Sequence, residues 1–394
     1  MKRITIFLLI LGLAASVLAM QMIIHKTDNT EVSIPISEIE SITFEELMDI
    51  VATPTFEPPG GTYDTEVFVE ILCATEDAVI RYTTDGTDPT DLSPGYTVPI
   101  ELSEDTTLKA RAYKYGWIES EIAEAIYIID IIPDEMVLVE GGTFSPDGGI
   151  YNVTLSSFYI CKYEVTQAEY LAVMGTNPGG SNSTIGDPLD HPINNVSWFN
   201  AIEYCNRLSM MEGLTPAYSY STYGTNPDNW PAGWNTSDAN HTNVSCNWSA
   251  NSYRLPTEME WEFAARGGVP AQNAGTFNST YAGTNVEAEL VNYAWYAANN
   301  SPYGTKPVGT KLPNELGLYD MSGNVWNWVW DIWSSNYPSG SFTDPTGPVS
   351  GAYRVMRGGS WGTVAIYCTV SYRSVDHATV TGNYLGFRVC RIVP

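Results

Sequence analysis

The sequence predicts an exported α+β chain in which a small all-β domain precedes a larger domain of low regular structure. Three observations carry this prediction. A charged and apolar leader opens the chain, strand-like alternation fills residues 53–129, and helix-capping signatures stand among loops rich in Gly, Asn and Trp beyond residue 130. The length of 394 residues suits two or three domains.

Residues 1–19 have the features of a signal peptide. Lys2 and Arg3 precede an apolar run, Ile4–Leu18, which is short for a membrane span. Small residues around Ala19 fit a cleavage site. We therefore expect an exported mature protein, periplasmic, cell-surface or extracellular, with no membrane span after removal of the leader. An uncleaved anchor is the alternative.

The acidic composition argues against two kinds of partner. The formal net charge is −27, from 45 acidic and only 18 basic residues. A nucleic-acid-binding face must be basic to meet the phosphate backbone, so we expect no nucleic-acid partner, and an anionic membrane surface is disfavoured for the same reason. An acidic surface favours solubility and offers oxygen ligands to Ca²⁺.

Two β-rich regions precede the larger domain. Residues 20–50 hold two short runs around a polar turn, which predicts a short β-hairpin that packs on a neighbour. Residues 53–129 alternate with the strand period of two between turns such as Asp85-Gly86. The phrase "IRYTTDGTDPT" and the later "TTLKARAY" resemble the chitobiase/β-hexosaminidase C-terminal-like domain. This resemblance implies an immunoglobulin-like β-sandwich that acts as a spacer, with carbohydrate or protein binding as the alternative.

Three helices are predicted beyond residue 130 from their N-terminal signatures. Each begins after a Ser or Thr that suits an N-cap, and two of the three form a capping box with a Glu three residues later. The predicted N-caps are Thr166, Ser197 and Thr257. The stretches 213–250 and 267–290 are predicted to be long polar loops.

Seven phrases of the larger domain stand in a telling order: "MVLVEGGTF", "FYICKYEVTQAEY", "PINNVSWFNAIEYCNRLS", "YRLPTEMEWEFAARGG", "NELGLYDMSGNVWNWVWD", "RVMRGGSW" and "GFRVCR". Their order and spacing resemble the sulfatase-modifying-factor family, which comprises formylglycine-generating-enzyme-like proteins. The resemblance covers residues 135–392 and implies a domain, 135–394, with a C-type-lectin-like fold of low regular structure.

The resemblance implies a copper oxidase among the active members of the family. Two cysteines in the pattern GGS-[aromatic]-x-C-x₄-C bind Cu(I), and the enzyme uses O₂ to convert a sulfatase cysteine to formylglycine. In this chain Ser360 matches the active-site serine, Thr363 occupies the first cysteine position and Cys368 the second. Cu(I) is soft and prefers thiolates, so a threonine hydroxyl is a poor ligand.

The sequence therefore predicts that the two-thiolate copper site is lost. Cys368 is then a core or disulfide cysteine, because an oxidising compartment permits disulfides among the six cysteines. The alternative is a replacement ligand that folds in from elsewhere, for which the candidates are Cys161, Cys246 and Cys390.

Calcium is the second cofactor that the resemblance implies, at two sites built from side-chain and backbone oxygens. Such oxygens suit a hard cation. The carried-over ligands are Asp320, Gly323, Val325 and Asn327 for the second site, and Asn292, Tyr293, Asn300 and Pro302 for the first. At Asn300 and Asn327 an amide stands where the family has a carboxylate, which weakens both sites. Turns rich in Asn and Gly that hold themselves together are the alternative.

Charged residues of the larger domain are expected to form its framework. Arginines of the family's framework should pair with buried carboxylates. Three glutamates at the start of the third helix should stabilise it, because negative charge interacts favourably with the positive N-terminal end of a helix. These residues are Arg357, Arg373, Arg388, Glu258, Glu260 and Glu262. A catalytic carboxylate pair is the alternative for the glutamates.

Two further chemistries have weak support. Residues 358–362 fit the letters G-x-S-x-G, but a nucleophile elbow also needs a preceding strand, a following helix and a positioned histidine. The four histidines are scattered along the chain. The same scattering excludes the iron-dependent sulfoxide synthases of this superfamily, which need a His-rich iron domain.

Two functions follow from the sequence. The first is a diverged, non-copper module that binds a glycan or an extracytoplasmic protein through aromatic loops. The loops in question surround Trp230, Trp234, Trp248 and Trp326. The alternative is a copper-dependent, formylglycine-generating oxidoreductase that acts on a sulfatase cysteine.

Overall fold

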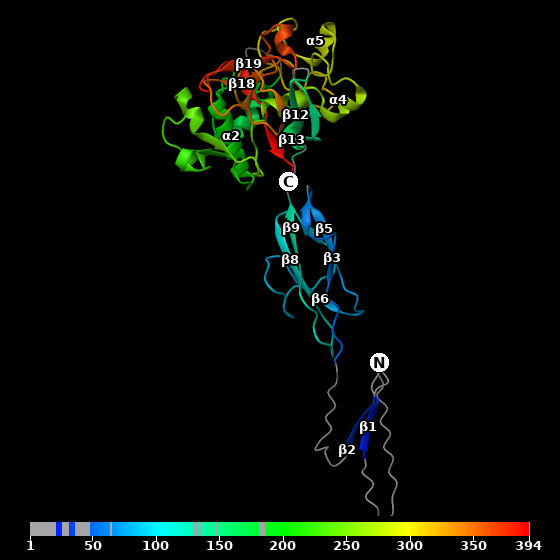
Figure 1. The fold of residues 1–394 in the computed structure, drawn as a ribbon. Helices are drawn as coiled ribbons and strands as arrows, with labels where there is room; N and C mark the ends of the chain where they lie inside the picture. The colour runs from blue at the N-terminus through cyan, green and yellow to red at the C-terminus, as the bar shows by residue number, and fades with distance from the viewer. Residues whose placement is uncertain are drawn as a thin grey trace, which may run out of the picture. The chain divides into compact units, whose positions relative to one another are not determined.

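The computed structural model describes residues 21–25, 31–35, 48–63, 65–129, 133, 135–146, 149–180 and 186–393. The chain is a mixed α/β protein with two compact units, residues 1–129 and 130–394 (Figure 1). The predicted signal peptide lies outside the described residues. No helix within the described part of the chain is long and apolar enough to cross a membrane.

The first unit contains the predicted pair of short strands and a double layer of sheet. β1 (Gln21–His25) pairs antiparallel with β2 (Glu31–Pro35), and the turn between them lies outside the described residues. The double layer consists of a three-stranded sheet in the order β3 (Thr55–Glu57), β5 (Val67–Leu72), β7 (Ile100–Leu102), and a four-stranded sheet in the order β4 (Gly61–Tyr63), β9 (Ala123–Ile129), β8 (Thr106–Tyr113), β6 (Val79–Thr83).

The two sheets share one hydrophobic core, formed by the side chains on their buried faces. In β5 the buried positions alternate strictly with exposed ones, as expected for a sheet with one face on a core. Val69 of β5 and Leu102 of β7 form one cluster with Leu108 of β8 and Tyr127 of β9. The first unit therefore has a hydrophobic core of its own.

Within its described residues, the second unit contains four small sheets. Two have three strands, in the orders β10 (Met136–Val139), β13 (Phe158–Cys161), β21 (Cys390–Ile392), and β11 (Gly142–Phe144), β12 (Tyr151–Leu155), β17 (Gly340–Thr343). One has four, in the order β19 (Arg373–Asp376), β18 (Arg354–Arg357), β16 (Trp326–Ile332), β20 (Leu385–Phe387), and the last pairs β14 (Tyr218–Tyr220) with β15 (Val244–Cys246). Because β21 pairs with β13, the last strand lies beside one of the first strands of this unit (Figure 1).

Three helices of the second unit begin where the capping signatures predict: α1 (Gln167–Met174), α2 (Trp198–Met211) and α3 (Glu258–Ala265). The described residues also contain α4 (Gly268–Ala274) and α5 (Leu290–Tyr293), which no capping signature predicted. The side chains of Thr166, Ser197 and Thr257 each accept a hydrogen bond from the third backbone amide of the helix that follows. The three predicted N-caps are confirmed.

The two predicted polar loops are more ordered than the sequence suggested. Residues 213–250 contain β14 and β15. Residues 267–290 contain α4, which a glycine makes possible: Gly267 has a φ of 85° and redirects the chain directly after α3. The prediction of long polar loops is therefore wrong where β14, β15 and α4 lie.

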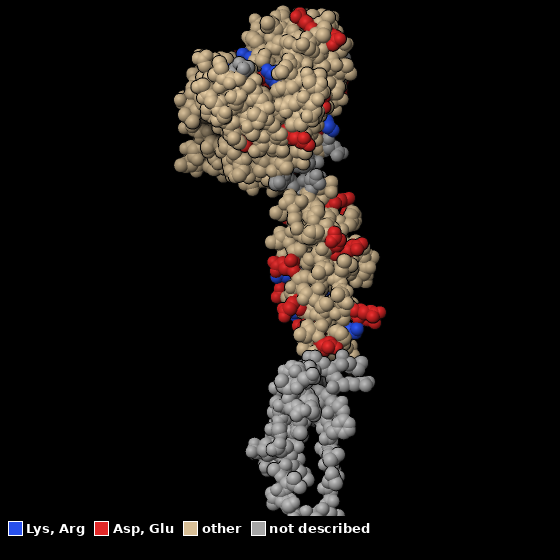
Figure 2. All heavy atoms as spheres, turned by 45° about the vertical axis from the view of Figure 1, so that its right-hand side comes forward, with Lys and Arg blue, Asp and Glu red and all other residues tan. Residues whose placement is uncertain are grey.

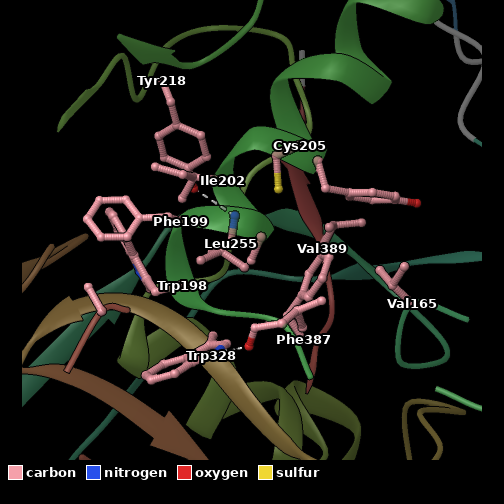
Figure 3. Close-up of a cluster of buried hydrophobic side chains, with 14 of the residues drawn as sticks. Val165, Trp198, Phe199, Ile202, Cys205, Tyr218, Leu255, Trp328, Phe387 and Val389 are labelled. Atoms are coloured by element: carbon pink, nitrogen blue, oxygen red, sulfur yellow. Dashed lines mark hydrogen bonds between the residues drawn. The ribbon is translucent and has the colours of Figure 1, made fainter. Parts of the chain in front are cut away.

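The core of the second unit gathers large aromatic residues on α2 and the central sheet (Figure 3). Trp198 on α2 is fully buried, and its indole N–H donates to the carbonyl of Val329 at 3.0 Å. Trp328 on β16 donates in the same way to the carbonyl of Val196 at 3.1 Å. Each large ring therefore packs in the core with its polar atom paired.

Most of the tryptophans expected to line exposed loops belong to this core as well. Trp230, Trp234 and Trp326 are 7%, 8% and 6% exposed, and the rings of Trp230 and Trp234 lie 4.4 Å apart. Trp248 is half-buried against Trp330. The hypothesis that these side chains are displayed to a ligand is wrong for the three buried ones, because packing uses their rings.

Candidate functional site

The segment after β18 makes a tight turn that depends on glycine. Gly358 and Gly359 have φ angles of 96° and 78°, a region that L-residues with side chains rarely adopt. A Cβ atom on Gly359 would lie 2.7 Å from the Sγ atom of Cys368. The two glycines thus allow the next residues to fold back over Cys368.

Ser360 and Thr363 close this turn by a reciprocal pair of hydrogen bonds. The backbone N–H of Ser360 donates to the hydroxyl of Thr363 at 2.9 Å, and that hydroxyl donates to the carbonyl of Ser360 at 2.9 Å. The threonine side chain therefore has a structural role of its own here, as an ordinary turn hydroxyl.

The turn brings the two positions of the copper motif together. The Oγ1 atom of Thr363 lies 3.5 Å from the Sγ atom of Cys368. Cys368 is fully buried in a cluster with Tyr281, Leu290 and Tyr296. Burial raises the pKa of its thiol to about 11, so the thiol is protonated at neutral pH. One protonated thiol and one hydroxyl stand where the active members of the family have two copper-binding sulfurs.

The candidate replacement cysteines lie in other parts of the core. The described cysteines are all free thiols, so Cys368 is a buried core cysteine and not part of a disulfide. Cys390 accepts a hydrogen bond from the Nη1 atom of Arg254 at 3.0 Å. Cys161 and Cys246 pack against the α2 core, apart from the cluster that holds Cys368. Among the described residues, none of these sulfurs contacts Cys368.

Ser360 also lacks the surroundings of a hydrolase nucleophile. Its side chain is 2% exposed, and a turn follows it where a nucleophile elbow needs a helix. The histidine rings that the structure describes are engaged elsewhere: His191 with Thr305, His241 with Gly351 and His377 with Asp238.

The second predicted calcium site contains a buried carboxylate with a free oxygen. Asp320 is 2% exposed; its Oδ2 atom accepts from the N–H of Gly309 at 2.8 Å, and its Oδ1 atom has no partner. Asn327 is committed instead to the framework, because its Oδ1 atom accepts from Arg388 at 2.9 Å and from Trp261 at 3.1 Å.

Glu164 is a functional candidate that the sequence reasoning missed. It is 1% exposed; its Oε1 atom accepts from the Asn327 side chain at 3.0 Å, and its Oε2 atom has no partner. Burial, and next the nearby charge of Asp320, raise the pKa of Glu164 well above its usual value, while burial raises that of Asp320 to about 6. Two adjacent buried carboxylates with unpaired oxygens fit a hard divalent cation. The sequence feature that could have indicated Glu164 is its place in "YEVTQ", within one of the phrases that resemble the family.

The first predicted calcium site holds a different cation. The ammonium group of Lys306 donates to the side-chain oxygen of Asn300, to the carbonyl of Pro302 at 2.7 Å and to the carbonyl of Gly304 at 2.9 Å. Asn292 is exposed, and its carbonyl accepts from the N–H of Leu312. Because Lys306 already occupies the oxygens of two expected ligands, this set of residues does not fit a metal ion.

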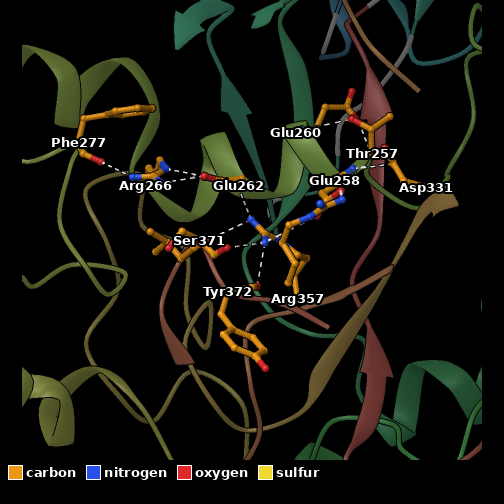
Figure 4. Close-up of polar contacts among 12 residues, drawn as sticks. Thr257, Glu258, Glu260, Glu262, Arg266, Phe277, Asp331, Arg357, Ser371 and Tyr372 are labelled. Atoms are coloured by element: carbon orange, nitrogen blue, oxygen red, sulfur yellow. Dashed lines mark hydrogen bonds and ion pairs between the residues drawn. The ribbon is translucent and has the colours of Figure 1, made fainter. Parts of the chain in front are cut away.

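The glutamates of α3 form ion pairs within the core (Figure 4). Glu260 pairs with Arg254 at 2.7 Å, Glu258 with Arg373 at 2.6 Å, and Glu262 with Arg266 at 2.7 Å. Arg357, fully buried, donates to Glu262 as well. The carboxylates are matched by guanidinium groups, which favours the framework role over a catalytic pair.

Arg388 departs from the expected pairing. Its donors contact the Asn327 side chain and the carbonyls of Cys161 and Tyr319, at 2.9, 3.1 and 2.8 Å. Among the described residues no carboxylate lies within ion-pair distance of it. The expectation of a direct carboxylate partner is wrong for Arg388, although it stays near Glu164 and Asp320 and favours their charged forms.

Large apolar side chains surround the turn that carries Thr363; five of them are exposed, and Trp361 is half-buried. We call this set the aromatic face; it comprises Tyr303, Trp361, Val364, Ile366, Tyr367 and Tyr384. Ile366 is 64% exposed, Tyr303 59% and Val364 55%. The ring of Tyr303 packs edge-on against Trp361 at 5.7 Å, and the indole of Trp361 donates to the carbonyl of Asn383, next to Tyr384.

Charge is distributed unevenly over the surface. In the view of Figure 2, Asp and Glu are dense over the first unit, while most of the visible second unit carries neither acidic nor basic side chains. The surface of the second unit in this view is thus suited to apolar and hydrogen-bonding contacts.

Two known families match parts of this chain. The description "Sulfatase-modifying factor enzyme 1-like domain" matches residues 131–393. The chain belongs to this family. The description "Chitobiase/beta-hexosaminidase C-terminal domain" matches residues 58–124. Both resemblances that the sequence phrases suggested are confirmed.

Relatives within the sulfatase-modifying factor family bear different names. "Chaperone protein LppX" of Paenibacillus barcinonensis is 40% identical over 276 residues, which cover 66% of this chain and 90% of that protein. The "Formylglycine-generating enzyme" of Bos taurus is 28% identical over 228 residues, 56% of this chain and 50% of that protein. The solved structure "Treponema denticola variable protein 1" superimposes with a TM-score of 0.58 at 34% identity, over 73% of this chain and 99% of that chain.

Proposed function

We propose that this chain is an exported, diverged member of the sulfatase-modifying factor family that has lost copper chemistry and binds a protein partner through the aromatic face. The observation that carries the proposal is the pair at the former copper site. Thr363 lies 3.5 Å from the only sulfur of that turn, and the sulfur belongs to a buried thiol.

The chemistry of this pair argues against oxidase activity. Cu(I) needs soft thiolates, and a hydroxyl that already closes a turn offers none. The thiol of Cys368 is protonated at neutral pH because burial raises its pKa to about 11. Binding a cysteine substrate through copper would need a second sulfur that the described residues do not supply here.

The composition of the aromatic face favours a protein over a glycan. Sugars stack on flat aromatic rings and need polar groups beside them, whereas Val364 and Ile366 are aliphatic and well exposed. Mixed aromatic and aliphatic patches that stay exposed on a folded protein commonly mark protein interfaces. Of the relatives named above, one is called a chaperone protein and one a variable protein, while a third is called a formylglycine-generating enzyme.

The remaining parts of the chain would hold the aromatic face in position outside the cell membrane. In this proposal the second unit is a C-type-lectin-like scaffold, the first unit an immunoglobulin-like sandwich that acts as a spacer, and residues 1–19 the export signal. Calcium at the second site would bind the carboxylates of Asp320 and Glu164, with the carbonyls of Gly323 and Val325 as further ligands, and would stabilise the scaffold by offsetting two buried negative charges.

The loss of copper chemistry is tested with the purified protein and its Thr363→Cys variant. Both are loaded with Cu(I) under reducing conditions, desalted and incubated with a cysteine peptide of the sulfatase type. We expect the wild type to retain no copper and to form no aldehyde by mass spectrometry, and the variant, with two sulfurs side by side, to retain about one copper per chain. An aldehyde formed by the wild type and abolished by Cys368→Ser would establish the oxidase instead.

The partner surface is tested by photo-crosslinking in cells that express the native protein. A photoreactive amino acid replaces Ile366 in one variant and Val349, which is 99% exposed outside the aromatic face, in a matched control. We expect a discrete crosslinked protein from position 366 only, identified by mass spectrometry and competed away by unlabelled wild-type protein. Equal crosslinking from both positions would contradict the proposed surface.

A further inference from the structure

A fully buried ammonium group lies among neutral oxygens beside the aromatic face. Lys306 is 0% exposed, and its three donors are matched by three acceptors, the Asn300 side chain and the carbonyls of Pro302 and Gly304. Within the described part of the chain no carboxylate forms an ion pair with it. A ring of side-chain and backbone oxygens around a cation is the arrangement of a hard-cation site, filled here by a side chain.

We propose that the ammonium group of Lys306 replaces a divalent cation in this loop, so that the segment 295–306 folds without metal. The same oxygens cannot serve both, since the carbonyl of Pro302 and the side-chain oxygen of Asn300 point their lone pairs at the ammonium. A dication beside the ammonium would also be repelled. The neutral Asn300 suits a single positive charge, whereas a dication would favour a carboxylate.

The buried ammonium is connected to the aromatic face by hydrogen bonds. The Nδ2 atom of Asn300 donates to the carbonyl of Trp361 at 2.9 Å. The backbone of Lys306 exchanges two hydrogen bonds with the side chain of Asn324, both at 3.1 Å, and the carbonyl of Asn324 accepts from the N–H of Trp361 at 2.7 Å. Lys306 is therefore a positioning residue for Trp361. This link to binding rests on the proposed function; the replacement of the cation does not.

The first experiment measures hydrogen exchange of the 295–306 segment in the full-length chain. We expect its protection in the wild type to be the same in excess EDTA and in millimolar Ca²⁺, even if Ca²⁺ protects peptides around Asp320. Lys306→Met leaves three oxygens without a donor, so we expect exchange of 295–306 and of the peptide containing Trp361 to rise at least tenfold. Calcium-dependent protection of 295–306 in the wild type, or unchanged exchange in Lys306→Met, would overturn the proposal.

The second experiment converts the loop into a metal site. Asn300→Asp combined with Lys306→Ala restores a carboxylate and removes the ammonium. We expect equilibrium dialysis to count one more Ca²⁺ per chain in this double variant than in the wild type. Asn300→Asp alone is the matched control and should gain none, because its carboxylate pairs with Lys306.

An additional Ca²⁺ in the single variant, or none in a folded double variant, would contradict the replacement. If variants of Lys306 fail to fold, the wild-type exchange experiment and the count for Asn300→Asp still decide. Failure of the crosslinking at Ile366 would remove the proposed partner surface and leave the Ca²⁺ counts unaffected, so the two proposals fail separately.

Discussion

Single residues decide the chemistry of this protein. Thr363 takes the place of a copper-binding cysteine and uses its hydroxyl to close a turn with Ser360. Lys306 brings a positive charge into an oxygen-lined loop. Each of these side chains makes hydrogen bonds at a position where the family resemblance implied a metal ion.

His241 should make the second unit sensitive to acid. It is 2% exposed, and its Nε2 atom contacts the carbonyl of Gly351 at 3.1 Å. Burial and next the guanidinium of Arg354 lower its pKa, against the hydrogen bond with Gly351 and the charge of Asp238. The unfolded chain therefore binds a proton below about pH 6.5 that the folded chain does not, and stability falls as the pH falls.

The expected size of this effect is at most about 1.4 kcal/mol between pH 7.5 and 5.5. Urea denaturation at the two pH values measures it, with His241→Gln as the comparison, because glutamine can still donate to Gly351. The variant should lose less stability on acidification than the wild type. Equal losses would show that His241 does not titrate differently in the folded state.

At the scale of elements, the glutamates of α3 tie the helix to the four-stranded sheet. Glu258 and Glu262 reach Arg373 on β19 and Arg357 on β18, while Glu260 reaches Arg254. The helix also begins with a capping box at Thr257. An eight-residue helix would be marginal alone, so these ion pairs and the buried side chains of Trp261 and Phe263 hold it in place.

Removal of one charge from this network should lower the free energy of unfolding substantially. Glu262→Gln leaves Arg357, which is 0% exposed, without its closest carboxylate. Breaking one partner of a buried pair costs about 3–5 kcal/mol, so we expect a loss of that order in the free energy of unfolding. Glu119→Gln, in the exposed pair with Arg111, should cost under about 1 kcal/mol. Similar losses in the two variants would refute the special role of the buried pair.

At the scale of the whole molecule, the two units have separate cores. The cluster of the first unit contains Val69 and Tyr127, and the clusters of the second unit contain only residues beyond 135. Compact units with their own cores commonly fold alone. We therefore expect the two units to be stabilised independently of each other.

Calorimetry should show this independence. We expect a fragment of residues 130–394 to unfold at the same midpoint, within about 2 °C, as the corresponding transition of the full chain, since no core residue is lost. A fragment lacking the core strand β21, residues 130–388, is the control and should not give a cooperative transition. A large downward shift for 130–394 would mean that the first unit stabilises the second.

Local signals were the parts of this structure that sequence could predict. The N-caps at Thr166, Ser197 and Thr257 need only a few neighbouring residues, and they are where the sequence placed them. Gly267 illustrates the limit: it ends α3 as expected, yet α4 starts directly after it. The exposure of aromatic side chains was not predictable in the same way, since Trp230 and Trp234 are buried by packing against other parts of the chain.

By itself the sequence determined the family, the starts of three helices and the loss of the first copper cysteine, because each of these depends on residue type and short spacing. Only the tertiary structure decided that Cys368 is a buried free thiol, that Lys306 lies in the loop expected for calcium and that Glu164 joins Asp320. Glu164 and Asn327 are 163 positions apart and still in hydrogen-bond contact. Burial and the convergence of such distant groups depend on how the whole chain packs, which local patterns do not contain.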